Sequence, residues 1–557
     1  MRWMSVQAWL DGQSWFDMKQ YRVLGPEGLS LHWSRYLDAG IAALYSLFRV
    51  FLPQAAAEQW TLVVWPNLVF VVLLAFVATG TRRILSNTAA IFAMLAAFTW
   101  MPIRGIAFRN GRIDHHSIQI VMTTILATAM ILPGRDLRRG LVAGLAAAFS
   151  LAIGLETLPV VAAAGTLLVL RFAFEAERAA SRLAGFCIAL SGGALVFFAG
   201  QTAPSDWLTP HCDALSTPFL AIILIASTGS SVALLLRRRL RHPAARLAVI
   251  AAIVGAGIWL AAPLLLPCLA GPYGALPLEA QYYISTRISE ALPALDFAMM
   301  RPLTFANVIL PVFLATALGT LFWVRNLGGR GRAEQSAIGQ MLVFGWFGLL
   351  GSLIQIRMNT IAAPALPFLV GYVLVELLQR LMIQRRLAIL AATIVVAIGT
   401  LLVAQLNGPQ QAILNWIAGR PIAMNIEKPS LDQSCRREAI LSPLNSLPKA
   451  RILAPLNLGA PIILVTHHDV LAVPYQRRVE AIWNGSIAFQ SEELLAAATA
   501  KGRADYIVLC NKTDYGDDFA FARDLKAGKT VSWLEPVPFG EDLRVFRVMP
   551  AALPPPD

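Results

Sequence analysis

Long apolar runs alternate with short polar connections over about the first 400 residues of the chain. Most of the runs approach twenty residues, the length that an α-helix needs to cross a hydrocarbon core of about 30 Å. The pattern therefore predicts an α-helical polytopic membrane protein with about twelve spans. The predicted spans lie at 60–79, 87–103, 116–132, 138–153, 155–172, 183–200, 216–236, 246–267, 305–324, 336–355, 359–378 and 386–405.

The apolar runs stop after residue 406, and a different pattern follows. Short β-rich stretches at 451–456, 461–468 and 506–511 surround a helix-like stretch at 491–502. Strands and helices of this length predict a small soluble α/β domain. The chain thus divides into three predicted regions: an amphipathic, Trp-rich segment (1–59), a transmembrane domain (60–406) and an α/β domain (407–557).

Composition and charge sharpen this picture. Hydrophobic residues make up 57% of the chain and charged residues only 14%, which excludes an ordinary soluble protein. The net charge of +13 does not indicate a nucleic-acid partner, because 19 Arg lie in one alternating set of loops and only six in the other. By the positive-inside rule the Arg-rich loops are cytoplasmic. The remaining loops and the C-terminal domain then face outward, and we expect a multi-pass protein of a bacterial inner membrane.

This orientation also places residues 1–59 outside, with no span ahead of them. We therefore expect a first transmembrane helix upstream of Met1.

Four of the five cysteines fall in predicted outward regions. Cys212 and Cys268 lie in outward loops, and Cys435 and Cys510 lie in the α/β domain. Two disulfides, Cys212–Cys268 and Cys435–Cys510, suit an oxidising compartment. Free buried thiols are the alternative, and Cys187, inside a span, is expected only to pack.

The stretch "FRNGRIDHHSIQI" at 108–120 places ionisable side chains where the chain enters a span. Asp114 and His116 are separated by one residue, so a carboxylate and an imidazole can converge on one cation. Oxygen plus nitrogen ligation suits Mn²⁺, Mg²⁺ or Zn²⁺. The alternative is that Asp114 only caps the helix.

Three further outward groups stand out, each with a plainer alternative. Glu290 lies in "YYISTRISEALP" (282–293), and its alternative role is that of a solvated residue on a surface helix. Arg357 lies at the end of a span, and its alternative role is contact with lipid headgroups. Glu156 lies in an outer turn, and its alternative role is to cap a helix. Together these charges suit a site that binds a phosphate or pyrophosphate through a metal and an Arg. Arg104 and Arg112 are weaker phosphate candidates.

At these residues the sequence resembles the catalytic subunit of oligosaccharyltransferase, among the C-type polytopic glycosyltransferases that use polyprenyl-phosphate-linked sugars. "GRIDHH" (111–116) is similar to the family's second acidic motif, and "TRISEALP" (286–293) to its S-V-S-E-H-Q-P motif. The stretch 356–374 is similar to a late span that carries an Arg. The resemblance implies that Asp114 and His116 bind a divalent cation (Mn or Mg). It also implies that Glu290 helps to hold the acceptor and the metal site, and that Arg357 meets the lipid-linked phosphate.

The resemblance also implies thirteen spans, the first of which precedes an outer loop with a metal-binding Asp. Residues 1–40 resemble that loop beyond the acidic position, so the first metal carboxylate is expected to lie outside this chain. Asp11 and Asp17 are the nearest replacements, and we do not assign them that role.

The C-terminal region departs from the family because it contains no W-W-D-Y-G motif. In "THHDVLAVPYQRR" (466–478), His467, His468 and Arg478 either contact an acceptor or sugar or are exposed strand and loop residues. We expect an enzyme that moves a sugar or oligosaccharide from a polyprenyl (di)phosphate donor, within membrane lipids, to an outward acceptor. One alternative is transfer of a monosaccharide from a polyprenyl monophosphate to lipid or polysaccharide. A second is a transporter of lipid-linked glycans, which would place its charges near the midplane of the membrane. A third is a non-catalytic remnant of such an enzyme.

Overall fold

The structure is a computed structural model that describes residues 1–274, 277–278, 281, 289–383, 433–475 and 477–553. The chain forms two compact units, which are described one at a time. A helical unit contains Trp33–Gly274 and the described residues of 289–383, whereas Met1–His32 joins the C-terminal region in an α/β unit. The predicted segment 1–59 is therefore shared between the two units. The predicted span at 386–405 lies outside the described residues.

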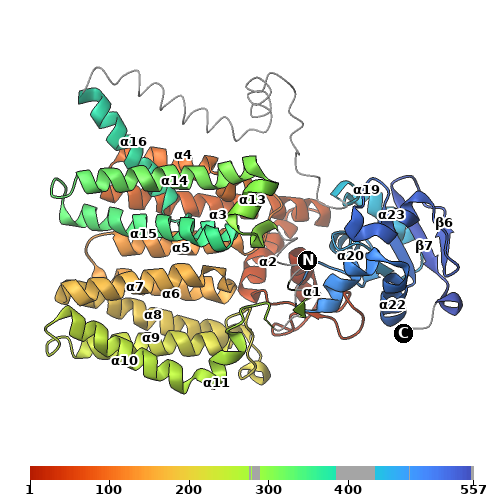
Figure 1. Cartoon of the computed structure of the whole chain (residues 1–557), viewed down its shortest axis with the longest axis horizontal. Coiled ribbons are helices and arrows are strands. Elements are labelled where there is room, and N and C mark those ends of the chain that lie inside the picture. Colours follow the sequence, from red (N-terminus) through yellow and green to blue (C-terminus); the bar gives the residue numbers. More distant parts are fainter. Residues whose placement is uncertain (275–276, 279–280, 282–288, 384–432, 476, 554–557) are drawn as a thin grey trace. The chain divides into compact units, whose positions relative to one another are not determined.

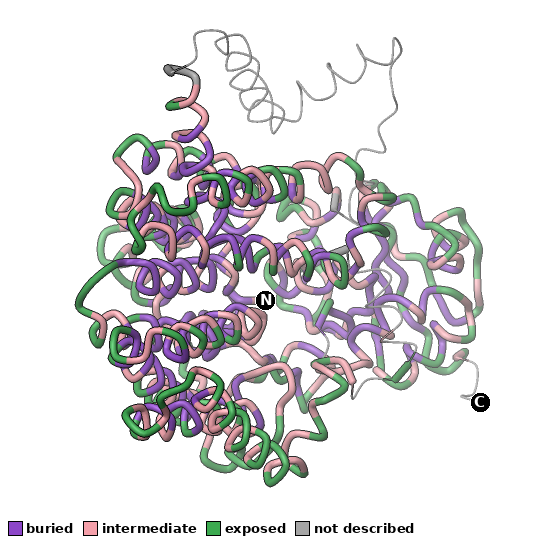
Figure 2. The backbone as a smooth tube through the Cα atoms, turned by 60° about the vertical axis from the view of Figure 1, so that its left-hand side comes forward, coloured by how far each residue is buried: buried purple, intermediate pink, exposed green. Residues whose placement is uncertain are grey.

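Helices of the helical unit run side by side in Figure 1. They are α2 (Arg35–Arg49), α3 (Gln54–Ile84), α4 (Asn87–Thr99), η1 (Met101–Ala107), α5 (His116–Ile131), α6 (Asp136–Ile153), η2 (Leu155–Thr157), α7 (Leu158–Glu175), α8 (Glu177–Gln201), η3 (Pro204–Asp206), α9 (Thr217–Leu235), α10 (Pro243–Leu260), α11 (Ala262–Leu265), η4 (Leu266–Cys268), η5 (Ser289–Ala291), α13 (Ala294–Met300), α14 (Pro302–Arg325), α15 (Arg332–Ile354), η6 (Ile356–Ala362) and α16 (Leu366–Ile383). Their inner faces are buried, and many outer positions are exposed (Figure 2). Large apolar side chains at those outer positions, such as Leu68, Val71 and Val196, suit contact with lipid.

Within the described residues, seven helices are long and apolar enough to span a membrane, or nine if each of two bent pairs counts as one span. The polytopic helical fold is therefore confirmed, but the predicted number of twelve spans is not. The predicted spans 87–103 and 359–378 are the bent pairs, with angles of 47° between α4 and η1 and 62° between η6 and α16. Pro102 and Pro364 stand at these breaks, where proline removes a backbone donor and crowds the preceding turn.

Helices α6 and α8 pack closely because glycines remove side chains from their contact. A Cβ on Gly140 would lie 2.1 Å from the Arg182 carbonyl oxygen, and one on Gly144 would lie 2.4 Å from that of Phe186. Gly185 of α8 makes the reciprocal approach, 2.4 Å from the Leu137 carbonyl oxygen. This is the small-residue packing typical of membrane helices.

The α/β unit contains a mixed five-stranded sheet of order β4-β3-β5-β7-β6. Strand β3 is parallel to β4 and β5, whereas β7 is antiparallel to β5 and β6. Its elements are α1 (Arg2–Leu10), β1 (Lys19–Gln20), β2 (Leu29–Ser30), η8 (Gln433–Cys435), α19 (Glu438–Leu441), η9 (Ser442–Ser446), β3 (Arg451–Leu453), α20 (Gly459–Val465), β4 (Asp469–Val470), α21 (Val479–Gly485), η10 (Ile487–Gln490), α22 (Glu492–Gly502), β5 (Tyr506–Cys510), η11 (Asp517–Phe519), α23 (Ala520–Ala527), β6 (Leu534–Val537), β7 (Leu543–Val548) and η12 (Pro550–Ala552). The small α/β region predicted from the sequence is thus present.

One predicted strand is wrong. Residues 461–465 lie in helix α20 rather than in a strand, and residues 466–468 lead from this helix into β4. Pro461 lies in the first turn of α20, where a helix tolerates proline. Ile462 and Ile463 are buried, so tertiary packing overrides the β-propensity of the Ile-Ile-Leu-Val run. The predicted strands at 451–456 and 506–511 are confirmed as β3 and β5, and the predicted helix at 491–502 as α22.

The N-terminal segment adds to the edge of this sheet. Val23 forms a parallel bridge with Val470 of β4. The Arg22 guanidinium donates to the carbonyl oxygens of Thr466 and His468 at 2.6 and 2.5 Å. These bonds satisfy an otherwise open strand edge and explain why Met1–His32 belongs to the α/β unit.

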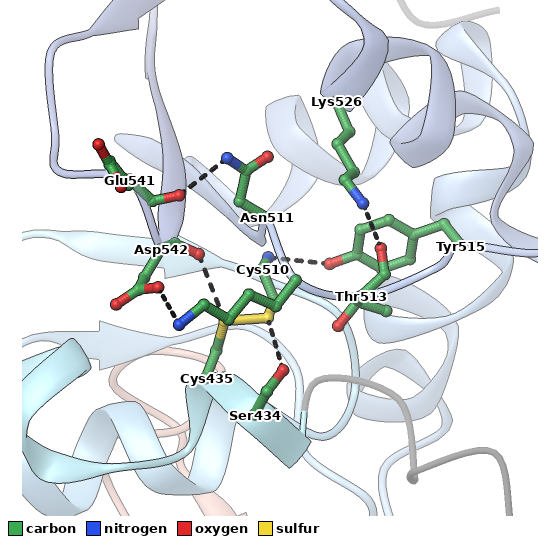
Figure 3. Close-up of a disulfide and its surroundings, with 10 residues drawn as sticks. Ser434, Cys435, Cys510, Asn511, Thr513, Tyr515, Lys526, Glu541 and Asp542 are labelled. Carbon is green, nitrogen blue, oxygen red and sulfur yellow. Dashed lines mark hydrogen bonds and ion pairs between the residues drawn. A yellow bond between two sulfur atoms is a disulfide. The ribbon is translucent and has the colours of Figure 1, made fainter.

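Both predicted disulfides are present, Cys212–Cys268 in the helical unit and Cys435–Cys510 in the α/β unit. Figure 3 shows the second, in which η8 is tied to the end of β5. Both of its cysteines are buried, and Tyr515 accepts a hydrogen bond from the Cys510 N–H at 2.9 Å. Cys187 is a free buried thiol, as expected.

Candidate metal centre

The candidate site begins in the loop that leads into α5. Asp114 is bound on both of its oxygens: Oδ2 accepts from Arg112 Nε at 2.5 Å, and Oδ1 accepts from the His116 N–H at 3.1 Å. Oδ1 also lies 3.2 Å from His116 Nδ1. Two donor atoms that share one ion at about 2.1 Å lie roughly 3 Å apart, so this pair fits a divalent cation. Asp114 also makes the local backbone contact expected of a capping residue, so both functions are compatible here.

A second pair of side chains lies behind the first. The His115 ring stacks on the His116 ring, with centroids 4.3 Å apart, and His115 Nε2 lies 3.0 Å from Glu156 Oε1. Gln119 Nε2 donates to Glu156 Oε2 and to the Gly154 carbonyl oxygen, both at 2.9 Å. Helix α6 and the η2 turn therefore bring Glu156 to the start of α5.

His115, His116 and Glu156 form a group whose ligand atoms all lie within 4.8 Å of one another. From the sequence, Glu156 was an outward charged candidate with a helix cap as its alternative, and His115 had no assigned role. The signal available in the sequence was Glu156, two positions after Gly154 in an outward turn. Nothing in the sequence, however, indicated that this turn folds back onto the loop before α5.

The charges in this cluster affect one another. Burial alone would raise the pKa of Asp114, but the neighbouring His116, with Arg112 and His115, outweighs burial and holds the pKa well below its usual range. Burial lowers the pKa of His115, and His116 lowers it further, although Glu156 opposes both effects. At neutral pH Asp114 is therefore an anion, the form that binds cations. His115 is neutral, so one of its ring nitrogens donates a hydrogen bond and the other accepts one.

Glu290 lies in η5 and Arg357 in η6, and a backbone hydrogen bond joins the two segments. Glu290 is exposed in η5, and the Ile356 N–H donates to the Leu292 carbonyl oxygen at 2.7 Å. Glu290 also interacts electrostatically with His116. Arg357 is half-buried in η6, and its Nε donates to Gln355 Oε1 at 2.8 Å. Residues 282–288 of the predicted Glu290 motif lie outside the described residues.

The two weaker phosphate candidates are engaged by their own surroundings. Arg104 donates to the Phe108 carbonyl oxygen at 2.5 Å, and its guanidinium lies 5.4 Å from the Phe70 ring centroid. Arg112 pairs with Asp114. Their assignment to a phosphate stays a prediction.

The remaining sequence candidates lie in the α/β unit. His468 is fully buried, so the expectation of an exposed residue is wrong for it, while His467 is exposed and Arg478 pairs with Glu27 at 3.2 Å. Asp17 accepts hydrogen bonds from the Lys19 N–H and the Tyr21 hydroxyl, and Asp11 is exposed. Asp17 therefore has a local structural role in its own turn.

No family model matches this chain, and no curated protein matches it by sequence. Solved structures do match. The archaeal oligosaccharyltransferase AglB from Archaeoglobus fulgidus, in complex with an inhibitory peptide and a dolichol-phosphate, is 13% identical with a TM-score of 0.63 over 92% of this chain and 65% of that one. The A. fulgidus oligosaccharyltransferase complex with Zn and sulfate is 12% identical with a TM-score of 0.56, over 89% of this chain and 61% of that one.

ArnT from Cupriavidus metallidurans, bound to undecaprenyl phosphate, is 13% identical, and the match covers 100% of this chain and 94% of that one. Its TM-score is only 0.42, which is too low to indicate a shared fold. This chain spans about 65% of the length of the archaeal enzyme that it matches. Identities this low identify a fold and not an activity. The resemblance read from the motifs is thus confirmed at the level of architecture: this chain has the fold of the archaeal oligosaccharyltransferase, a polytopic membrane glycosyltransferase.

Proposed function

We propose that this protein is a metal-assisted membrane glycosyltransferase that moves a sugar or oligosaccharide from a polyprenyl (di)phosphate donor to an acceptor on the outer side of the membrane. The observation that carries the proposal is the fold shared with the archaeal oligosaccharyltransferase over 92% of this chain. The ionisable cluster at the start of α5 supports it, because a carboxylate and an imidazole lie 3.2 Å apart there. The archaeal enzyme is described with a dolichol-phosphate, which supports a polyprenyl-linked donor.

Asp114 and His116 would hold the divalent cation, which supplies positive charge against the donor phosphate. Mn²⁺ and Mg²⁺ are the proposed ions, and the archaeal structure in complex with Zn and sulfate supports binding of a divalent ion. Arg357 would stabilise the negative charge of the departing phosphate, since its planar guanidinium can make two parallel bonds to phosphate oxygens. Glu290, exposed and close enough to His116 to interact with it, would orient the acceptor or complete the metal shell.

The orientation proposed from the Arg-rich loops puts this cluster, the Glu290 segment and the α/β unit outside a bacterial inner membrane. Donor and acceptor would therefore meet on the outer face. Arg104 and Arg112 stay secondary candidates for phosphate contacts.

The test separates metal binding from transfer. In the purified full-length chain, Asp114→Ala should abolish Mn²⁺ binding, whereas Arg357→Ala should leave it intact. In cells that depend on the protein, both variants should accumulate polyprenyl-linked sugar, measured by mass spectrometry of the lipid extract. Exposed Arg238, in the predicted cytoplasmic loop, provides a charge-matched control (Arg238→Ala). Wild-type Mn²⁺ affinity in Asp114→Ala, together with normal turnover of the donor in both variants, would overturn the proposal.

A second function has one observation in its favour. The chain contains no W-W-D-Y-G motif, which in the resembled family reads the acceptor sequon. Transfer of one sugar from a polyprenyl monophosphate to lipid or polysaccharide is therefore the alternative. Identifying the product that disappears in Arg357→Ala cells, as glycoprotein or as glycolipid, distinguishes the two.

A further inference from the structure

The second layer of the candidate metal centre is built from buried polar groups. Gln119 is 3% exposed and His115 is 7% exposed, yet each makes a specific bond to Glu156. Glu156 is thereby held through both oxygens, one by an imidazole and one by an amide. Glu156 itself is half-buried, and an ionisable group held in this way at the end of an apolar helix is a candidate for function.

Direct ligation by both histidines is disfavoured by their geometry. The His115 and His116 rings are stacked with an interplanar angle of 26° and centroids 4.3 Å apart. A metal ion bound to an imidazole lies in the ring plane, about 2.1 Å from the nitrogen. Two nearly parallel rings at this separation do not place one ion in both planes. Since His116 is the histidine beside Asp114, His115 is left to support it.

We propose that Glu156 and His115 are positioning residues for the metal centre: Glu156 fixes His115, and the His115 ring holds the His116 ring in the orientation that faces Asp114. This inference rests on the proposed function, in which Asp114 and His116 bind the cation. In other metal sites, removal of the hydrogen-bonded partners that orient a ligand weakens metal binding by about 10- to 100-fold. We expect a loss in this range here, where ring stacking of His115 on His116 provides the support.

Gly154 explains why the side chains of the second layer can approach one another so closely. A Cβ at this position would lie 2.4 Å from Glu156 Oε2, 2.9 Å from Gln119 Nε2 and 3.2 Å from His115 Cδ2. A methyl group there would displace all three side chains without removing any polar atom. Gly154→Ala is therefore a second, independent way to disturb the proposed support.

The experiment measures Mn²⁺ affinity in the purified full-length chain. We expect Glu156→Ala and Gly154→Ala to weaken binding by about 10- to 100-fold. Glu156→Gln keeps an oxygen for the His115 N–H and should recover most of that loss. Gly165→Ala is the matched control, because its Cβ would meet only Phe186 Cε1, at 3.6 Å. Thermal unfolding of each variant without metal checks that the fold is intact.

A spectroscopic measurement separates support from ligation. With Co²⁺ as the probe, Glu156→Gln should leave the visible absorption spectrum unchanged, because the first coordination sphere is the same. A changed spectrum would make Glu156 a ligand and overturn the proposal. Wild-type affinity in both Glu156→Ala and Gly154→Ala, with binding lost in Asp114→Ala, would overturn it while leaving the proposed function standing. Failure of the proposed function is distinct, since Asp114→Ala would then bind Mn²⁺ normally.

Discussion

Asp114 illustrates how one carboxylate can satisfy several demands. Its Oδ2 faces Arg112 and its Oδ1 faces the backbone and ring of His116. Because these partners outweigh burial, the pKa of Asp114 is well below its usual range and the carboxylate is charged at neutral pH. A metal ion would compete with Arg112 for this anion, so the affinity of the site depends on a cation that already belongs to the chain.

His468 is a buried imidazole in which one ring nitrogen donates a hydrogen bond and the other accepts one. Nε2 donates to the Leu444 carbonyl oxygen at 2.8 Å, and Nδ1 accepts from the Ala450 N–H at 3.2 Å. Protonation would turn Nδ1 into a donor that faces a donor. Burial lowers the pKa of His468; Leu444 and Asp469 oppose this effect, and His467 and Arg22 add to it.

We therefore predict that acid weakens the α/β unit. A folded-state pKa below the unfolded value of about 6.5 means that the unfolded state takes up the proton first. The stabilisation is complete above pH 6.5 and is lost as the pH falls toward the folded-state pKa, by at most about 1.4 kcal/mol per pH unit. Hydrogen exchange of the β3 and β5 amides between pH 7.5 and 5.5, corrected for the intrinsic rate, measures it. His468→Gln should remove the effect and His467→Gln, at the exposed neighbour, should retain it; an identical pH response in His468→Gln contradicts the prediction.

The sequence alone singles out Asp114 and His116 as candidates because ionisable residues are rare in so apolar a chain. It does not predict that His115 pairs with Glu156. Their pairing requires α6 to return to the start of α5, and this contact is set by packing between segments 41 positions apart. Local patterns carry no information about such a contact, so the supporting layer of a site is harder to predict than the ligands.

Helix packing is the next scale, and the α6–α8 pair depends on its glycines. A Cβ on Gly144 would lie 2.4 Å from the Phe186 carbonyl oxygen and 2.8 Å from the Leu190 nitrogen. Backbone atoms cannot rotate away as a side chain can, so the helices must separate. We predict that Gly144→Ala lowers the free energy of unfolding by about 1–3 kcal/mol.

The matched control for Gly144→Ala lies in α8 itself. Gly192 has no heavy atom within 4 Å of its would-be Cβ, so Gly192→Ala adds a methyl group without a clash. Alanine is also the better helix former, so its melting temperature should stay the same or rise. Thermal unfolding in detergent compares the two variants. Equal destabilisation would show that the loss comes from the methyl group and not from the helix contact.

Elements were easier to predict than their ends and bends. Apolar length located most of the helices, because a membrane span must be long and apolar. It did not predict that α4 and α16 would each pair with a bent segment, although Pro102 and Pro364 mark both breaks. Residues 461–468 were misread as a strand because β-branched residues occur equally well in a short buried helix such as α20.

At the scale of the helical unit, the connections between helices fall into two alternating sets, one rich in Arg and one poor in Arg. The His115–Glu156 bond, the Cys212–Cys268 disulfide and the Ile356–Leu292 bond join connections that belong to one set. Arg182 with Asp136, and Arg330 and Arg380 with Glu376, join connections of the other. The second set is the Arg-rich one that the sequence predicts to be cytoplasmic. Contacts in the structure thus group the loops as the charge pattern does.

The orientation predicted from the Arg-rich loops can be measured. A membrane-impermeant maleimide applied to intact spheroplasts should label Thr530→Cys, an exposed position in the α/β unit, and should not label Arg238→Cys, in the α9–α10 connection. Both should be labelled after the membrane is opened with detergent, which controls for reactivity. Cys187 is buried and the other four cysteines are paired, so the background is low. If Arg238→Cys reacts in intact cells and Thr530→Cys does not, the metal centre faces the cytoplasm, and a lipid-linked donor would have to be used on that side.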